Sequence, residues 1–172
     1  MLPSSPRRLT ALETITIRPA VVADVPGIAR LVLANVMQGK VLPRSAEAIE
    51  ATLADWIVAC ANDEILGNVS LLRYTSGLVE VRSLAVEERY QGLRIGSKLL
   101  EALLVEARGR QIQTLFALTR KVAFFERFGF LITERSRFPE KVWHDCSLCP
   151  MINNCDETAM VLELTAASAS QG

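Results

Sequence analysis

A strand pattern that leads through a two-glycine turn into a long amphipathic helix places the strongest constraint on the fold. The strand is expected over residues 78–86, the turn contains Gly92 and Gly96, and the helix spans residues 94–108. Apolar side chains recur along one face of this helix, at Ile95, Leu99, Leu100, Leu103 and Leu104. Together these patterns predict a mixed α/β domain.

Strand and helix patterns alternate along the rest of the chain. Helices are expected from an Asp24 cap to Gln38–Gly39, from a Ser45 cap to about Trp56, and over residues 122–128. The further strands are expected over residues 14–18, 57–61, 65–74, 112–119, 130–133 and 158–164. The order β-α-α-β-β-β-α-β-α-β-β predicts an α/β fold with a mostly antiparallel central sheet flanked by helices. Residues 134–156 are expected to be irregular.

The length of 172 residues fits one domain, which we expect over residues 14–165. Residues 1–13 are interpreted as a flexible leader and residues 166–172 as a flexible tail. Lys and Arg number 19, and Asp and Glu also number 19, so the chain lacks the basic excess typical of nucleic-acid binding. No apolar run approaches the ~18 residues of a membrane span, so neither nucleic acid nor a membrane is an expected partner.

Four cysteines bear on the compartment and on metal binding. Cys146, Cys149 and Cys155 cluster near the C-terminus, and Cys60 stands alone, which is not a disulfide framework. The expected compartment is therefore the cytoplasm. With His144, the cluster has soft ligands for zinc, but only one C-x2-C pair is present. Three reduced thiols in a loop explain the pattern as well, and no metal site is assigned.

The turn after residues 78–86 has the chemistry of an anion site. Backbone N–H groups at the start of a helix have no partner within it, and the helix dipole adds partial positive charge there. A pyrophosphate is a suitable ligand, and Arg94 adds a full charge. The alternative is an ordinary strand–turn–helix connection. The P-loop pattern and the G-x-G-x-x-G dinucleotide pattern are both missing from the sequence.

Gln91-Gly92-Leu93-Arg94-Ile95-Gly96 resembles motif A of the GNAT acetyltransferases, written Q/R-x-x-G-x-G/A. The fourth position differs, because it holds Arg94 in place of glycine. The second half of the family pattern is present at residues 123–130, and the resemblance covers about residues 14–164. It implies the GNAT fold and acetyl-CoA as the acetyl donor. By position, it implies that the backbone of Leu84, Ala85 and Val86 pairs with the pantetheine arm, and that the pyrophosphate is held at Gln91, Gly92, Leu93, Arg94, Gly96 and Ser97.

The resemblance narrows further to the short bacterial N-acetylglutamate synthases. The similar blocks are residues 39–45, 80–86, 116–119 and 141–157. This likeness implies transfer of acetyl to the α-amine of L-glutamate, which is the first step of arginine biosynthesis. It also implies direct transfer in a ternary complex of enzyme, donor and acceptor.

An acceptor with two carboxylates needs fixed cations, and arginine binds carboxylates with two parallel hydrogen bonds. Arg44, which follows a proline between the first two helices, and Arg82, in the central strand, are the candidate substrate-binding residues. Lys40 and Arg73 are more simply explained as solvated surface charges.

The acceptor amine is an ammonium ion at neutral pH and must lose a proton before it attacks the thioester. Glu80 matches in position the base of several GNAT enzymes and is the candidate catalytic residue, although a carboxylate there can also simply pair with a cation such as Arg82. Phe125 stands where many GNAT enzymes have a tyrosine as general acid. The thiolate then leaves unaided or is protonated by water or another group.

Two alternatives remain open from the sequence. The first is a GNAT enzyme that acts on another small amine or on a protein N-terminus. The second is a non-catalytic acyl-CoA sensor, which the missing tyrosine favours and Glu80 disfavours. The oligomeric state is also open, a homodimer included.

Overall fold

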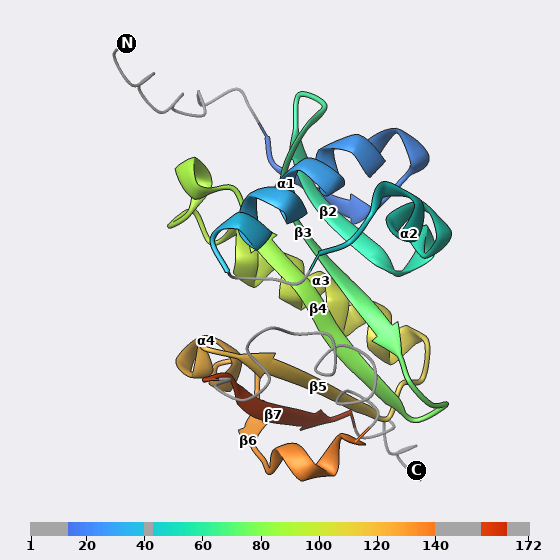
Figure 1. Cartoon of the computed structure of the whole chain (residues 1–172), viewed down its shortest axis with the longest axis vertical. Coiled ribbons are helices and arrows are strands. Elements are labelled where there is room, and N and C mark those ends of the chain that lie inside the picture. The colour runs from blue at the N-terminus through green and yellow to red at the C-terminus, as the bar shows by residue number, and fades with distance from the viewer. Residues whose placement is uncertain (1–13, 40–42, 140–155, 165–172) are drawn as a thin grey trace, which may run out of the picture. The chain divides into compact units, whose positions relative to one another are not determined.

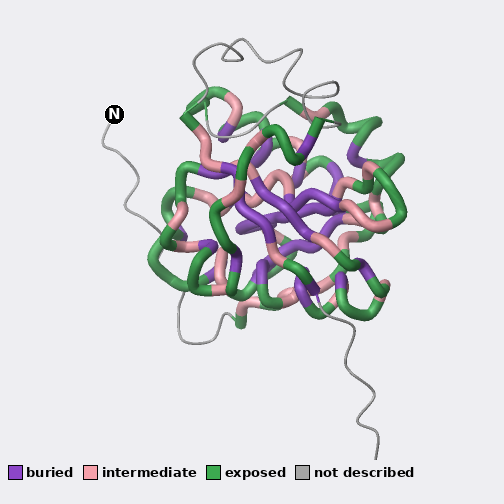
Figure 2. Tube along the Cα trace, turned by 90° about the horizontal axis from the view of Figure 1, so that it is seen from below, coloured by how far each residue is buried: buried purple, intermediate pink, exposed green. Residues whose placement is uncertain are grey.

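The computed structural model describes residues 14–39, 43–139 and 156–164 (Figure 1). The expected leader at residues 1–13, the expected tail at residues 166–172, Lys40 and the cysteine cluster lie outside these ranges. Buried positions are concentrated in the strands, and exposed positions are common in the turns and loops (Figure 2).

Within the described residues, seven strands form one sheet in the order β1-β2-β3-β4-β5-β7-β6. Their bounds are β1 Thr16–Pro19, β2 Trp56–Ala61, β3 Glu64–Arg73, β4 Leu78–Val86, β5 Thr114–Thr119, β6 Leu131–Ile132 and β7 Thr158–Glu163. The β1–β2, β2–β3, β5–β7 and β6–β7 pairs are antiparallel, whereas β4 and β5 run parallel. This arrangement confirms the predicted α/β class with a mostly antiparallel sheet.

Four α-helices accompany the sheet in the described ranges: α1 Val25–Met37, α2 Ala46–Ala51, α3 Ile95–Gly109 and α4 Val122–Glu126. Short 3-10 turns occupy Val22–Asp24, Leu53–Asp55, Glu88–Tyr90 and Arg135–Arg137. The chain divides into two compact units, one with Met1–Ser70 and Ser83–Leu103 and the other with Leu71–Arg82 and Leu104–Gly172. We call them unit 1 and unit 2.

Unit 1 is built on the apolar face of α1. Ile28, Leu31 and Val32 recur at helical spacing, are almost fully buried, and belong to one cluster with Trp56 and Val58 of β2. Because full burial of such a side chain is worth about 1.5–3 kcal/mol, this face holds α1 against the strands.

Unit 2 has an aromatic core. Phe116 of β5 stacks on Phe138 with ring centroids 4.2 Å apart and planes 12° apart. Both rings are almost fully buried and cluster with Ala159 and Val161 of β7. Tyr74 and other partly buried apolar side chains pack against this cluster. This cluster therefore holds β5 and β7 together, and β5 pairs with the part of β4 that carries Glu80.

Asp24 has a different role from the helix cap that the sequence predicts. It immediately precedes α1, but its side chain makes no capping hydrogen bond to that helix. Its carboxylate instead accepts hydrogen bonds from Arg18 Nη1 at 2.6 Å and from the Val21 N–H at 2.8 Å. These bonds, that from Arg18 first, hold the pKa of the Asp24 carboxyl below its ordinary value. Asp24 thus stands at the predicted N-cap position of α1, but a nearby guanidinium takes its carboxylate in place of the helix N–H groups.

The second helix is shorter than predicted. The Ala48 N–H donates to Ser45 Oγ at 3.1 Å, which confirms the predicted cap, but α2 ends at Ala51. Trp56 is the first residue of β2, and all six residues of that strand are buried. The strand therefore begins where the continuous apolar run begins, and Trp56 is not helical. The other element boundaries agree with the predictions to within two residues.

Candidate functional site

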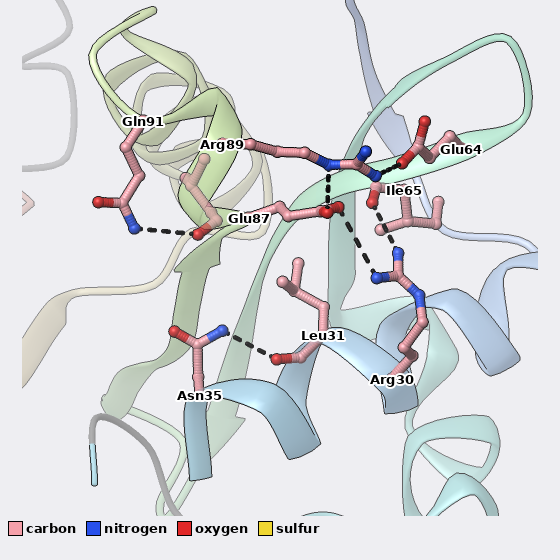
Figure 3. A network of polar contacts seen from close by, with 9 residues as sticks. Arg30, Leu31, Asn35, Glu64, Ile65, Glu87, Arg89 and Gln91 are labelled. Carbon is pink, nitrogen blue, oxygen red and sulfur yellow. Dashed lines mark hydrogen bonds and ion pairs between the residues drawn. The ribbon is translucent and has the colours of Figure 1, made fainter. Parts of the chain in front are cut away.

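The segment between β4 and α3 in unit 1 is anchored by polar contacts to two other elements (Figure 3). The Glu87 N–H donates to the Leu66 carbonyl of β3 at 2.8 Å, and Arg89 Nε donates to Glu87 Oε1 at 2.6 Å. Arg30 of α1 lies 3.7 Å from Glu87 Oε2, measured from its Nη1. Each ion pair contributes little stability, because its arginine is exposed, but together these contacts tie α1, β3 and this segment to one another.

The turn that follows is exposed and has unusual backbone angles. Gly92 has φ +85° and Arg94 has φ +62°, and a Cβ added at Gly92 would meet no atom within 4 Å. Gln91 closes the start of the turn, since its Nε2 donates to the Val86 carbonyl at 3.2 Å. The sequence-predicted residues at the turn, Gln91, Gly92, Leu93, Arg94, Gly96 and Ser97, thus lie together with the end of β4.

The helix start completes an anion-binding geometry. The Lys98 N–H donates to the Arg94 carbonyl at 3.1 Å, so Arg94 directly precedes the first turn of α3. The helix has 15 residues, and its first turn contains no acidic residue. Free N–H groups and the positive end of the helix dipole therefore face an exposed turn, which fits the diphosphate of a coenzyme.

The left-handed conformation of Arg94 explains why the family motif has glycine at this position. We expect Arg94→Val to be less stable than Arg94→Gly by about 1–2 kcal/mol, because a Cβ is disfavoured at positive φ and a β-branched residue most of all. Urea unfolding of both variants measures this difference. Arg94→Lys, which keeps the charge, separates the backbone effect from the charge effect. Equal stability of the valine and glycine variants would contradict the backbone assignment.

Glu80 lies in unit 2, on the part of β4 that pairs with β5. It is directly opposite Phe116 in the parallel ladder and is only 3% exposed. The Tyr74 hydroxyl donates to Glu80 Oε2 at 2.8 Å, and the Tyr74 ring lies 5.7 Å from that of Phe116. The carboxylate is thus held by a phenol beside an aromatic cluster, and a buried carboxylate of this kind is a candidate proton acceptor.

The two predicted acceptor-binding arginines lie in different units. Arg82 belongs to unit 2, is partly exposed, and follows Glu80 by two residues on β4, so the strand alternation puts both on one face. Arg44 belongs to unit 1, is partly exposed, and donates from Nη1 to the Pro43 carbonyl at 2.7 Å. It immediately precedes Ser45, the cap of α2.

Sequence reasoning missed Tyr74 and Asn68. Tyr74 lies in the hairpin between β3 and β4, where its N–H donates to the Leu78 carbonyl at 3.0 Å. Pairing across this short hairpin was the signal that could have linked it to Glu80. Asn68 is a fully buried residue of β3. An asparagine in the interior of a strand was itself a signal, because strands are depleted in this residue.

Phe125 is a core residue. It is 5% exposed, and its ring meets that of Phe130 edge-on at 5.1 Å. The side chain at the position where a tyrosine acid is common therefore serves packing, and it has no proton to give.

Residues 14–39, 43–139 and 156–164 contain no group of three or more His, Cys, Asp or Glu residues arranged to hold a metal ion. Cys60 is a free, buried cysteine of β2. None of the helices found in these ranges has the length and apolar character needed to cross a bilayer.

Comparison with known proteins agrees with this geometry. Residues 37–130 match the acetyltransferase (GNAT) family. An uncharacterized N-acetyltransferase of Chlorobaculum tepidum is 36% identical over 148 residues, which are 86% of this chain and 96% of that protein. The amino-acid acetyltransferase of Mycobacterium tuberculosis is 31% identical over 133 residues, or 75% of each protein.

A solved structure extends the likeness. The N-acetylglutamate synthase of Neisseria gonorrhoeae, complexed with coenzyme A and N-acetyl-glutamate, matches with a TM-score of 0.77 at 28% identity. The match covers 88% of this chain and 35% of that one, so this chain spans about a third of the synthase. Acetyl-CoA is the donor in this family, and the anion-binding turn before α3 fits its diphosphate. The chain therefore belongs to the GNAT family of acetyltransferases.

Proposed function

We propose that this GNAT enzyme transfers the acetyl group of acetyl-CoA to the α-amine of L-glutamate, the first step of arginine biosynthesis. The observation that carries the proposal is the structural match to a synthase complexed with N-acetyl-glutamate. The Mycobacterium relative, named an amino-acid acetyltransferase, supports the acceptor class over three quarters of the chain.

The donor is proposed to bind along the end of β4 and across the following turn. Leu84, Ala85 and Val86 offer backbone groups to the pantetheine arm. The amides of the turn and the first turn of α3 hold the pyrophosphate. The exposed left-handed residues Gly92 and Arg94 support this assignment, because they turn the backbone ahead of a helix N-terminus.

Glu80 is proposed as the base that accepts a proton from the acceptor ammonium, directly or through a water molecule. The amine nitrogen then forms a bond to the acetyl carbon, the bond from that carbon to the thioester sulfur breaks, and the nitrogen releases its second proton to solvent to give the amide. The electron pair leaves on the thiolate, which takes a proton from solvent or from another group, because Phe125 has none to give. The hydrogen bond from Tyr74 supports this role, since it fixes the orientation of the carboxylate.

Arg44 and Arg82 are proposed to bind the two carboxylates of the acceptor. Each carries a planar guanidinium that suits two-point contacts with a carboxylate. Both are partly exposed, which leaves room for a ligand to approach. An acceptor with no acidic group would offer neither arginine a carboxylate to bind.

Thiol release from acetyl-CoA, measured with each amino acid and the common polyamines in turn, tests this function. We expect turnover with L-glutamate. We expect Arg44→Ala to raise the KM for glutamate about 10- to 100-fold, because a lost charge-assisted hydrogen bond is worth about 1.5–3 kcal/mol. The KM for acetyl-CoA should stay constant.

Arg73→Ala is the matched control, because Arg73 is an exposed arginine whose Nη1 donates to the Ser76 carbonyl. It removes the same charge and should leave the KM for glutamate unchanged. Equal effects of the two variants would mean that Arg44 contributes only positive charge to the protein and makes no specific contact with glutamate. Turnover with a different amine would discard glutamate but keep the enzyme class. Binding of acetyl-CoA with no turnover on any amine would favour an acyl-CoA sensor.

A further inference from the structure

A fully buried asparagine on β3 donates a hydrogen bond to Ser83, a residue of β4 with a left-handed backbone conformation. Asn68 is 0% exposed, and its Nδ2 donates to the Ser83 carbonyl at 2.7 Å. Its Oδ1 is also buried, and within the described residues it has no hydrogen-bond partner. Both residues belong to unit 1.

Ser83 has a left-handed backbone inside a strand. Its φ of +53° is one that residues with a Cβ rarely adopt, and a strand interior normally has extended angles throughout. One such residue kinks a strand and re-aims the peptide groups that follow. The groups that follow Ser83 are those of Leu84, Ala85 and Val86, which we assign to the donor.

The residue before Asn68 shapes the same stretch from β3. A Cβ added at Gly67 would lie 3.0 Å from the Ala85 carbonyl oxygen and 2.9 Å from Leu99 Cδ1. The backbone of β3 therefore lies directly against Ala85, and only glycine permits this approach. Gly67 and Asn68 together set the path of β4 from Ser83 to Ala85.

A role in packing alone does not explain Asn68. A buried acceptor without a partner is costly, and an apolar side chain of similar size would avoid that cost. The Nδ2 donor of the amide explains its presence, because it satisfies the carbonyl of Ser83, whose backbone conformation is disfavoured. Asn35 of α1 offers a contrast, because its Nδ2 donates at 2.8 Å to the Leu31 carbonyl within an ordinary helix.

We propose that Asn68 is a positioning residue that holds β4 in its kinked form and so presents the backbone of Leu84, Ala85 and Val86 to the acetyl-CoA donor. It acts through Ser83 and does not itself touch the donor. The inference rests on the donor strand of the proposed function, and it is independent of the identity of the acceptor.

Calorimetric titration of the full chain with CoA, in the absence of any acceptor, tests this role. Asn68→Asp keeps the size of the side chain but replaces the Nδ2 donor with an oxygen. Because one neutral hydrogen bond shifts an equilibrium by up to about tenfold, we expect the Kd for CoA to rise about tenfold. Adding Ser83→Gly should recover most of the loss, since glycine adopts a positive φ without help.

Two further variants keep the test decisive. Asn35→Asp alters the other buried asparagine of the described ranges and should leave the Kd for CoA unchanged, even if it lowers the unfolding temperature. Ser83→Val opposes the left-handed backbone with Asn68 intact, and it should weaken CoA binding to a similar extent. This second route remains available if Asn68→Asp does not fold.

The outcomes distinguish the donor assignment from the role of Asn68. Failure of the wild-type chain to bind CoA would overturn the donor assignment itself. A folded Asn68→Asp variant that binds CoA as the wild type does would overturn only the role of Asn68. Loss of binding that Ser83→Gly does not rescue would also overturn it, because Asn68 would then act by another route.

Discussion

Replacing Glu80 by glutamine is expected to lower kcat about 100-fold or more, the range that a positioned general base contributes. Glutamine has the same shape, and its Oε1 still accepts the hydrogen bond that Tyr74 donates to Glu80 Oε2 at 2.8 Å. The fold should therefore survive while the proton acceptor is lost. Thiol release at saturating acetyl-CoA and acceptor measures kcat, and urea unfolding checks the stability.

The pH dependence of the kcat defect in Glu80→Gln and the variant Tyr74→Phe both test whether Glu80 acts as a base. If Glu80 removes a proton from the amine, the defect should shrink as the pH rises and the free amine becomes abundant without a base. Tyr74→Phe retains the carboxylate and removes only the hydroxyl that orients it, so a smaller loss, about tenfold, is expected. A Glu80→Gln enzyme with kcat within threefold of the wild type, about 0.7 kcal/mol, would assign Glu80 to structure alone.

Replacing Gly67 by alanine is expected to lower the free energy of unfolding by about 1–3 kcal/mol, the usual cost of overpacking a core. The added Cβ would lie 2.9 Å from Leu99 Cδ1 and 3.0 Å from the Ala85 carbonyl oxygen. Leu99 is fully buried and has little room to turn away. The strain is therefore shared with β4, and CoA binding should weaken together with stability.

Gly109→Ala is the matched control for Gly67→Ala. Gly109 is the last residue of α3, and an added Cβ there meets no atom within 4 Å. This substitution should be neutral, or stabilise by a few tenths of a kcal/mol to about 1 kcal/mol, because alanine restricts the unfolded chain. Equal stability of the two variants in urea unfolding would contradict the close approach of the β3 backbone to Ala85.

Most of the fold was predictable because hydrophobic periodicity is a local property. The apolar face of α3 and the runs of strand-forming residues in β3 and β4 predicted boundaries within two residues of those observed. The errors came where a distant partner decides the local structure. Asp24 bonds to Arg18, six residues earlier, and Trp56 joins a strand by pairing with Ser70. No local pattern contains those partners.

The site was predictable in its motif but not in its supporting contacts. The turn at Gln91 to Gly96 was visible as a pattern of residue types. The departure at Arg94 became intelligible only with its backbone angle, because a left-handed residue has no signature when it is not glycine. Tyr74 and Asn68 act across strand pairs, so their roles depend on register, which the sequence does not fix by itself.

The strand order of unit 2 has a consequence for synthesis of the protein. β7 is the last strand of the described chain, yet it lies inside the sheet between β5 and β6. It pairs with β5 from Thr114↔Glu163 to Thr119↔Thr158, and with β6 at Leu131 and Ile132. Chains emerge from the ribosome N-terminus first, so β5 and β6 wait with open edges until β7 arrives. An open apolar edge invites association with other chains. A product ended shortly before Thr158 would thus be an aggregation hazard, not merely a shorter enzyme.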